Sequence, residues 1–252
     1  MRQKLKIKNI FGEKLDCLVE GNVDSDQVVI FVHGYGTDKD EGFASFLDLA
    51  DYLQDEFLLL RFDLSGYGQS EGDDYEFNFH KATADVDSVI RYVRRKYLGK
   101  EINIIAHSMG TFVVMLLSPY GVRKVVFTSI VNSNVKFISR WLERRILSKG
   151  GQVDKDGISV YPRTKGGVQK IGRDFWRTLE NFEPAVYLEE LKRKTDLIVF
   201  KPRNDDVLPD KYFEVYKQIL GSLYVEVEGD HNFRDPQERL ALFKRIRGFL
   251  VE

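Results

Sequence analysis

A serine at position 108 stands where a buried strand is expected to turn sharply into a helix. Residues 102–106 form an apolar run, and residues 112–116 continue with apolar side chains that suit a helix. Ser108 has small residues two positions before and after it, Ala106 and Gly110. Such a tight turn excludes bulky neighbours and exposes the serine hydroxyl above a sheet, as a nucleophile requires. The alternative is that Ser108 only caps the following helix.

A serine hydroxyl near neutral pH needs a base, and the chain offers four histidines. His231 follows the last expected strand, which brings it to the same carboxyl edge of the sheet as Ser108. We expect His33, in a glycine-rich loop, to brace backbone, and His107 to point away from the serine. His80 begins an expected helix and has no site around it. His231 is therefore the predicted base, with an ordinary loop histidine as the alternative.

A histidine base is normally oriented by a carboxylate, and two places in this architecture could supply one. The first, after the strand at 125–128, is empty, because residues 102–142 contain no Asp or Glu. The second, after the strand at 197–200, carries the adjacent pair Asp205 and Asp206. Spacing alone leaves both residues open as the orienting acid.

Acyl transfer also needs two N–H donors for the developing oxyanion. The backbone amide of Met109, directly after Ser108 at a helix N-terminus, is the first candidate. The second is the backbone amide of Tyr35, in a loop whose Gly34 and Gly36 allow an unusual backbone course. Those glycines could instead suggest a phosphate loop, but no GxxxxGK[ST] or GxGxxG pattern is present.

Strands and helices alternate along the chain in a way that positions these residues. The expected strands are 4–9 and 15–19, forming an antiparallel hairpin, followed by 27–32, 57–62, 102–106, 125–128, 197–200 and 223–227. The expected helices include 43–53, 82–97 and a last helix capped by Asp235 with Pro236 in its first turn. This alternation predicts an α/β fold with a mostly parallel central sheet and helices on both faces.

About 65 residues separate the strand at 125–128 from the one at 197–200, more than a crossover needs. We expect residues 131–192 to form a cap, or lid, inserted between two parts of the core, 1–130 and 193–252. The cap would contain helical segments at 135–147 and 175–182 and a hairpin-like piece between them. The alternative is an insertion that only buries its own small core. Candidate pocket residues are aromatic: Trp141, Tyr161, Phe175 and Trp176.

The composition excludes several other classes of protein. Lys and Arg total 38 against 39 Asp and Glu, which leaves a net charge of −1 and no electrostatic case for nucleic acid or an anionic membrane. The single cysteine, Cys17, cannot form an internal disulfide, and no zinc-ligand spacing is present. The first residues lack the apolar core of a signal peptide, and no run is long enough to span a membrane. We expect a cytoplasmic protein.

The motifs taken together resemble the α/β-hydrolase superfamily over nearly the whole chain. Within it, the sequence is similar to the serine aminopeptidase-like branch, and to cinnamoyl (feruloyl) esterases and related carboxylesterases in particular. In that family the acid usually precedes x-V-x-P, which selects Asp205, and the order Ser, Asp, His is the family's order. The segments that carry the resemblance are 33–36, 63–72, 106–110, 205–209 and 229–233.

The resemblance implies hydrolysis of a small carboxylic ester through an acyl-serine intermediate. Ser108 would attack, His231 would take the proton, Asp205 would orient His231, and the amides of Tyr35 and Met109 would hold the oxyanion. The mechanism requires no metal or organic cofactor, and the sequence predicts no oligomeric state. The same residues could cleave amides, as in aminopeptidases, or thioesters, with Glu180 or Glu183 in the cap binding a substrate amine. A hydrolase fold used only for binding is the remaining alternative.

Overall fold

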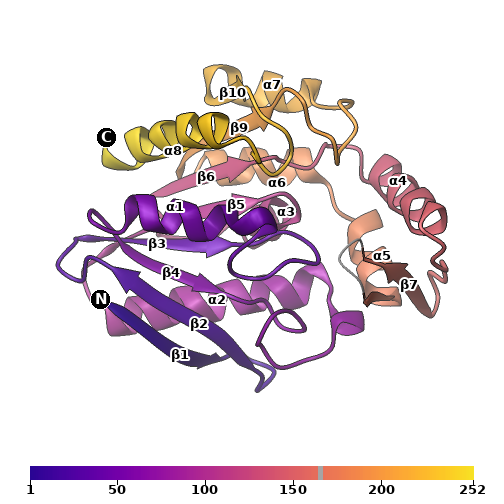
Figure 1. The fold of residues 1–252 in the computed structure, drawn as a ribbon, viewed down its shortest axis with the longest axis horizontal. Helices are drawn as coiled ribbons and strands as arrows, with labels where there is room; N and C mark the ends of the chain where they lie inside the picture. Colours follow the sequence, from indigo (N-terminus) through magenta and orange to yellow (C-terminus); the bar gives the residue numbers. More distant parts are fainter. Residues whose placement is uncertain (164–166) are drawn as a thin grey trace.

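A single eight-stranded sheet organises the chain (Figure 1). The computed structural model describes residues 1–163 and 167–252. The spatial order of the strands is β1-β2-β4-β3-β5-β6-β9-β10. Their bounds are Arg2–Lys8 (β1), Lys14–Gly21 (β2), Gln27–Val32 (β3), Leu58–Phe62 (β4), Glu101–His107 (β5), Lys124–Thr128 (β6), Asp196–Pro202 (β9) and Tyr224–Val227 (β10).

The sheet has an antiparallel edge and a parallel remainder. β1 pairs with β2, and β2 with β4, in antiparallel register, whereas every pairing from β4 through to β10 is parallel. The predicted N-terminal hairpin and the mostly parallel central sheet are thus confirmed. The strands from β3 to β6 are almost wholly buried and mostly apolar, as expected for parallel strands covered on both faces. Arg61 in β4 and Asn103 in β5 are buried polar residues among them.

Two layers of helices cover the sheet. Helices α1 (Ser45–Leu53) and α8 (Pro236–Val251) pack on one face, around Phe46, Leu49 and Ile246. The larger apolar cluster, on the other face, contains residues of six helices: α2 (Phe79–Lys96), α3 (Met109–Leu117), α4 (Val135–Ser148), α5 (Arg173–Glu180), α6 (Pro184–Lys192) and α7 (Glu214–Leu220). Each helix buries one apolar stripe, which stabilises the fold in proportion to the area removed from water.

The part of the expected cap from α4 to α5 lies beyond the arrowheads of β3 and β4, at the carboxyl end of the parallel strands, whereas its last helix, α6, packs against α3, α7 and β9 (Figure 1). The part beyond the arrowheads contains α4 (Val135–Ser148), the antiparallel pair β7 (Ile158–Pro162) and β8 (Val168–Gly172), and α5 (Arg173–Glu180). Residues 164–166 of this segment are outside the described residues. The division of the chain into a core and a cap at 131–192 remains a prediction.

The β7–β8 hairpin is fastened to the core by several polar contacts. The backbone amide of Lys170 donates to Asp74, in the short helix η2 (Asp74–Glu76), at 2.8 Å. Gln169 donates to the Tyr67 hydroxyl at 2.9 Å, and Arg163 donates to the carbonyl of Gly36 at 2.9 Å. The hairpin therefore touches the loop that follows β3.

Three elements were not anticipated from the pattern. β8 completes the hairpin-like piece, and α6 and α7 are short helices of nine and seven residues. α6 buries Leu188 and Leu191 in the same cluster as α2 and α3. The stability of such short helices comes mainly from the surface they pack against, which the spacing of apolar residues does not reveal. In the described part of the chain, no helix is long and apolar enough to cross a membrane.

Candidate functional site

Ser108 occupies a strained turn between β5 and α3. Its backbone has φ 50° and ψ −124°, a conformation that a residue with a side chain rarely adopts. The amide of Ser108 donates to the carbonyl of Thr128 at 3.0 Å, which ties the turn to the end of β6. Gly110 packs so closely on β3 that a Cβ there would lie 2.5 Å from the carbonyl oxygen of Val32. The turn therefore has the geometry that the small residues around Ser108 predict.

Ser108, His231 and Asp205 lie in one chain of hydrogen bonds. The Oγ of Ser108 is 3.0 Å from Nε2 of His231, although the two residues are 123 positions apart in the sequence. On the other side of the ring, Nδ1 of His231 is 2.9 Å from Oδ2 and 3.0 Å from Oδ1 of Asp205. If Nδ1 carries the proton that the carboxylate accepts, Nε2 is left free to accept the hydroxyl proton of Ser108.

The surroundings of Asp205 favour its ionised form. Burial alone would raise the pKa of this carboxyl, but hydrogen bonds from His231 and from the amides of Leu208 and Val207 outweigh it, and the pKa is lowered. The amides of Leu208 and Val207 donate hydrogen bonds of 2.7 and 3.0 Å to the same carboxylate oxygen, Oδ1. They fix the carboxylate within its own loop, so its orientation does not depend on His231.

Asp206, the neighbouring candidate, points elsewhere. Its carboxylate is 2.5 Å from Arg234, and both side chains are almost half exposed. The two adjacent aspartates thus face different partners, and only Asp205 contacts His231.

The other three histidines have separate environments. Nε2 of His33 accepts a hydrogen bond from the amide of Leu64 at 3.0 Å, in keeping with its expected role in bracing backbone. His80 is exposed in the first turn of α2. His107 is buried, with Nδ1 2.9 Å from the Thr128 hydroxyl and its ring centroid 5.1 Å from that of His231. Burial lowers the pKa of His107 to about 4, so this ring is neutral near pH 7.

The loop at residues 33–36 lies directly beside the nucleophile. A Cβ placed on Gly34 would be 3.2 Å from the Cβ of Ser108. Among the described residues, neither the amide of Tyr35 nor that of Met109 donates to another protein group. Both amides are therefore without a protein acceptor in the described part of the chain, and their role as oxyanion donors remains a prediction.

The four candidate aromatic residues of the cap differ in what they can reach. Tyr161, Phe175 and Trp176 are almost fully buried. The Trp176 N–H donates to Ser159, the Tyr161 hydroxyl accepts from Arg145, and the Phe175 ring lies 5.0 Å from that of Tyr35. Trp141 is partly exposed. The role of these four side chains in a substrate pocket therefore remains a prediction.

Glu180 and Glu183 are the two acidic cap residues predicted as alternative partners for a substrate amine. The carboxylate of Glu180 accepts from the Ser139 hydroxyl at 2.7 Å and pairs with Lys155 at 3.0 Å. Glu183 is exposed just before α6. Glu180 is already neutralised by its neighbour, so nothing in this geometry favours an amine substrate.

Two neighbouring residues were not anticipated from the sequence. Ser129, with φ 51°, donates from its hydroxyl to the carbonyl of His231 at 2.7 Å. Glu41 is buried and accepts from the amide of Gly34. Neither residue belongs to a recognisable motif. The Ser129 contact joins loops that are 102 positions apart in the sequence, whereas the Glu41 contact spans only seven positions.

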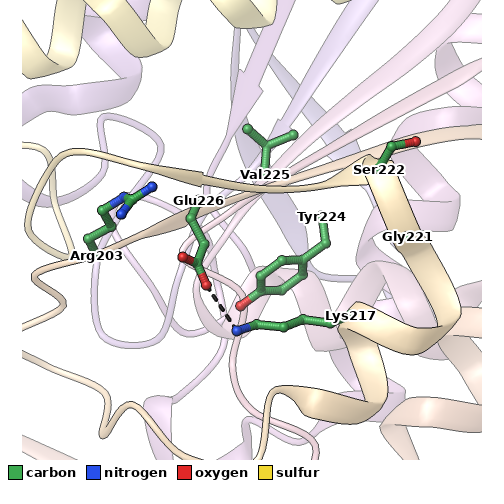
Figure 2. A pocket seen from close by; sticks show the side chains of 7 residues that line it. All are labelled: Arg203, Lys217, Gly221, Ser222, Tyr224, Val225 and Glu226. Carbon is green, nitrogen blue, oxygen red and sulfur yellow. Dashed lines mark ion pairs between the residues drawn. The ribbon is translucent and has the colours of Figure 1, made fainter.

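A hollow elsewhere on the surface contains none of these residues. Figure 2 shows it along the edge strand β10, lined by side chains that include Arg203, Tyr224 and Glu226. Lys217 and Glu226 form an ion pair across it at 3.0 Å. In residues 1–163 and 167–252, no group of His, Cys, Asp and Glu side chains is arranged to hold a metal ion.

Fold and site geometry together define a hydrolase class, and the sequence comparison agrees with it. Residues 27–166 match the alpha/beta hydrolase fold family, and this chain belongs to that family. No curated protein has a matching sequence.

Several solved structures share the fold over the whole chain. Est1E from Butyrivibrio proteoclasticus, solved with ferulic acid bound, is 15% identical with a TM-score of 0.73, and the match covers 98% of each chain. The esterase domain of a Rhodothermus marinus protein is 17% identical with a TM-score of 0.73, covering 99% of this chain and 97% of that one. The Pyrococcus furiosus esterase Pf2001 is 16% identical with a TM-score of 0.73, covering 99% and 90%.

Proposed function

We propose that this protein is a serine hydrolase that cleaves carboxylic esters, with Ser108, His231 and Asp205 as its catalytic triad. The observation that carries the proposal is the continuous set of hydrogen bonds from Asp205 through His231 to Ser108. The strained backbone of Ser108 supports it, because such strain at a nucleophile exposes the hydroxyl to substrate.

The reaction has two halves. Oγ of Ser108 attacks the ester carbonyl carbon as its proton passes to Nε2 of His231, and the amides of Tyr35 and Met109 donate to the resulting oxyanion. The tetrahedral intermediate collapses, and the departing alkoxide takes the proton from His231. Water then attacks the acyl-serine with His231 again as base, which releases the carboxylic acid and restores the Ser108 hydroxyl.

We propose esters of aromatic acids, of the cinnamoyl or feruloyl type, as the substrate class. The similar fold of Est1E, which was solved with ferulic acid, supports this class.

The test combines active-site labelling with turnover. A fluorophosphonate should add one adduct per chain to the wild-type protein, detected by intact mass, and none to Ser108→Ala. Hydrolysis of p-nitrophenyl acetate, p-nitrophenyl butyrate and methyl ferulate should fall at least 10³-fold in Ser108→Ala. Ser222→Ala, which removes an exposed hydroxyl from the hollow in Figure 2, is the matched control and should keep both labelling and turnover.

A folded wild-type protein that neither labels nor turns over any ester would contradict the proposal. In that case the alternative of a hydrolase fold used for binding would be favoured. Turnover of p-nitroanilides or thioesters in preference to esters would keep the triad and replace the substrate class.

A further inference from the structure

The segment after the 33–36 loop has an unusually strained backbone. Glu41, Phe43 and Ala44 all have positive φ, of 60°, 55° and 58°. Non-glycine residues in such conformations destabilise the fold and persist where surrounding contacts fix them, often at functional sites. Gly42 lies so close to the His231 loop that a Cβ on it would be 2.4 Å from Oδ1 of Asn232.

The carboxylate of Glu41 and the side chain of Ser108 both lie beside Gly34, because a Cβ on Gly34 would be 3.3 Å from Oε2 of Glu41 and 3.2 Å from Cβ of Ser108. Glu41 is 7% exposed, and its Oε2 accepts from the amide of Gly34 at 2.5 Å. Its Oε1 accepts from the amide of Gly42 at 2.8 Å. In the described part of the chain, Glu41 forms no ion pair with a basic side chain, so the buried charge is satisfied by backbone N–H groups.

The peptide group between Gly34 and Tyr35 is held on its other side. The carbonyl of Gly34 is 2.8 Å from Nδ1 of His33 and 3.1 Å from the Thr37 hydroxyl. In a trans peptide the N–H points opposite to the preceding C=O, so these contacts fix the direction of the Tyr35 N–H. Glu41 therefore holds the N–H of Gly34, and His33 and Thr37 hold the carbonyl of the same residue.

We propose that Glu41 is a positioning residue for the oxyanion hole: by binding the amide of Gly34, it keeps the Tyr35 N–H aimed at the developing charge. The inference rests on the proposed function, because it assigns a role in that reaction. Donors that are aligned before the reaction need no reorganisation when charge develops, which is the source of their effect on rate. Loss of Glu41 should therefore weaken transition-state binding more than substrate binding.

The experiment compares Glu41→Gln and Glu41→Ala with wild type. Glutamine retains the side-chain size and one acceptor oxygen, so it can serve only one of the two amides, whereas alanine serves neither. We expect kcat per labelled active site to fall about 10–100-fold in Glu41→Ala and less in Glu41→Gln, with KM changed less than about threefold. This loss is below the 10²–10³ seen when an oxyanion donor is removed outright, because the Tyr35 N–H is displaced but still present.

The inhibition constant Ki of a trifluoromethyl ketone tests the inference further, because it would not change if Glu41 had only a structural role. The ketone forms a hemiketal oxyanion on the serine, so its Ki should rise by the same factor as kcat falls. Asp51→Ala, which removes an exposed carboxylate from α1, is the control and should leave kcat and Ki unchanged. The unfolding temperature shows whether each variant is folded, and the fluorophosphonate stoichiometry gives its active fraction. If Glu41→Ala does not fold, the kcat and Ki of Glu41→Gln test the inference.

Three results would overturn the inference. A lower unfolding temperature with kcat and Ki per active site unchanged would assign Glu41 a structural role only. A fall in kcat without a rise in Ki would mean that Glu41 does not act on the oxyanion donors. A wild-type protein without labelling or turnover would overturn the proposed function first, and this inference with it.

Discussion

Asp205 and Asp206 show how one position in a loop changes what a carboxylate can do. Asp205 is buried, accepts two amides of its own loop and contacts His231. Asp206 is exposed to solvent and pairs with Arg234. A carboxylate that must orient an imidazole needs a fixed direction, and a partly exposed ion pair does not provide one.

Replacing each aspartate by asparagine separates the two. Asp205→Asn should lower kcat by about 10⁴, because an amide at this position no longer fixes the reactive tautomer of His231. Asp206→Asn removes only an exposed ion pair, worth roughly 0–1 kcal/mol, and should leave kcat within about twofold. Steady-state kinetics with p-nitrophenyl butyrate measures both. The reverse pattern would assign the acid to Asp206.

His107 is the other residue whose environment has a measurable consequence. Burial lowers its pKa from 6.5 to about 4, with the carboxylates of Glu41 and Asp205 opposing the shift and His231 adding to it. As the pH falls below 6.5, the unfolded chain binds a proton at this histidine, and the native protein does not until about pH 4. Its contribution to stability is therefore complete above pH 6.5 and is lost between pH 6.5 and 4.

This loss should amount to on the order of 3 kcal/mol in the free energy of unfolding. Urea unfolding at pH 7, 6 and 5 should show a steeper decline for wild type than for His107→Phe, which carries no titrating group there. His80→Gln, a change at an exposed histidine, should follow the wild-type slope. Parallel curves for wild type and His107→Phe would show that His107 does not titrate in this way.

Among the elements, the turn from β5 into α3 depends on how closely two neighbouring strands approach it. The last residue of β6 accepts the amide of Ser108, and the carbonyls of Val32, at the end of β3, and of His33, directly after it, face Gly110. The strain at Ser108 is maintained by these contacts rather than by the turn residues alone.

Two glycine-to-alanine substitutions test this dependence. Gly110→Ala would place a Cβ 2.5 Å from one backbone oxygen and 2.7 Å from another, so it should lower the unfolding temperature and abolish most turnover. Gly248→Ala, inside α8 with no atom within 4 Å of the added Cβ, should stabilise the protein by roughly 0.5–1 kcal/mol. Thermal unfolding and ester turnover of both variants provide the check. A tolerated Gly110→Ala would mean that the turn can relax without cost.

At the scale of the whole molecule, the sheet brings together residues that the chain keeps far apart. Ser108 follows β5, Asp205 follows β9 and His231 follows β10, and all of these strands run parallel. Parallel strands end at one edge, so each loop delivers its residue to the same place. The β7–β8 hairpin then covers part of this edge through Arg163 and Gln169.

The amino-acid sequence alone predicts the fold class, the eight strands of the main sheet, and the loops that carry the proposed nucleophile, base and acid. These follow from local patterns: continuous apolar runs mark the buried strands, and the small residues around Ser108 mark the tight turn. The sequence pattern did not predict α6, α7 and β8, because each is short and is stabilised mainly by the surface it packs against.

Three features are visible only in the tertiary structure. Asp205 is the aspartate that contacts His231, the buried ring of His107 packs against the ring of His231, and the carboxylate of Glu41 binds the amide of Gly34. The family resemblance favoured Asp205, but the residues alone left Asp206 open. The physical reason is that the direction of a loop side chain depends on backbone angles and on neighbours from distant segments. Neither is encoded in the residue type or in the spacing of a motif.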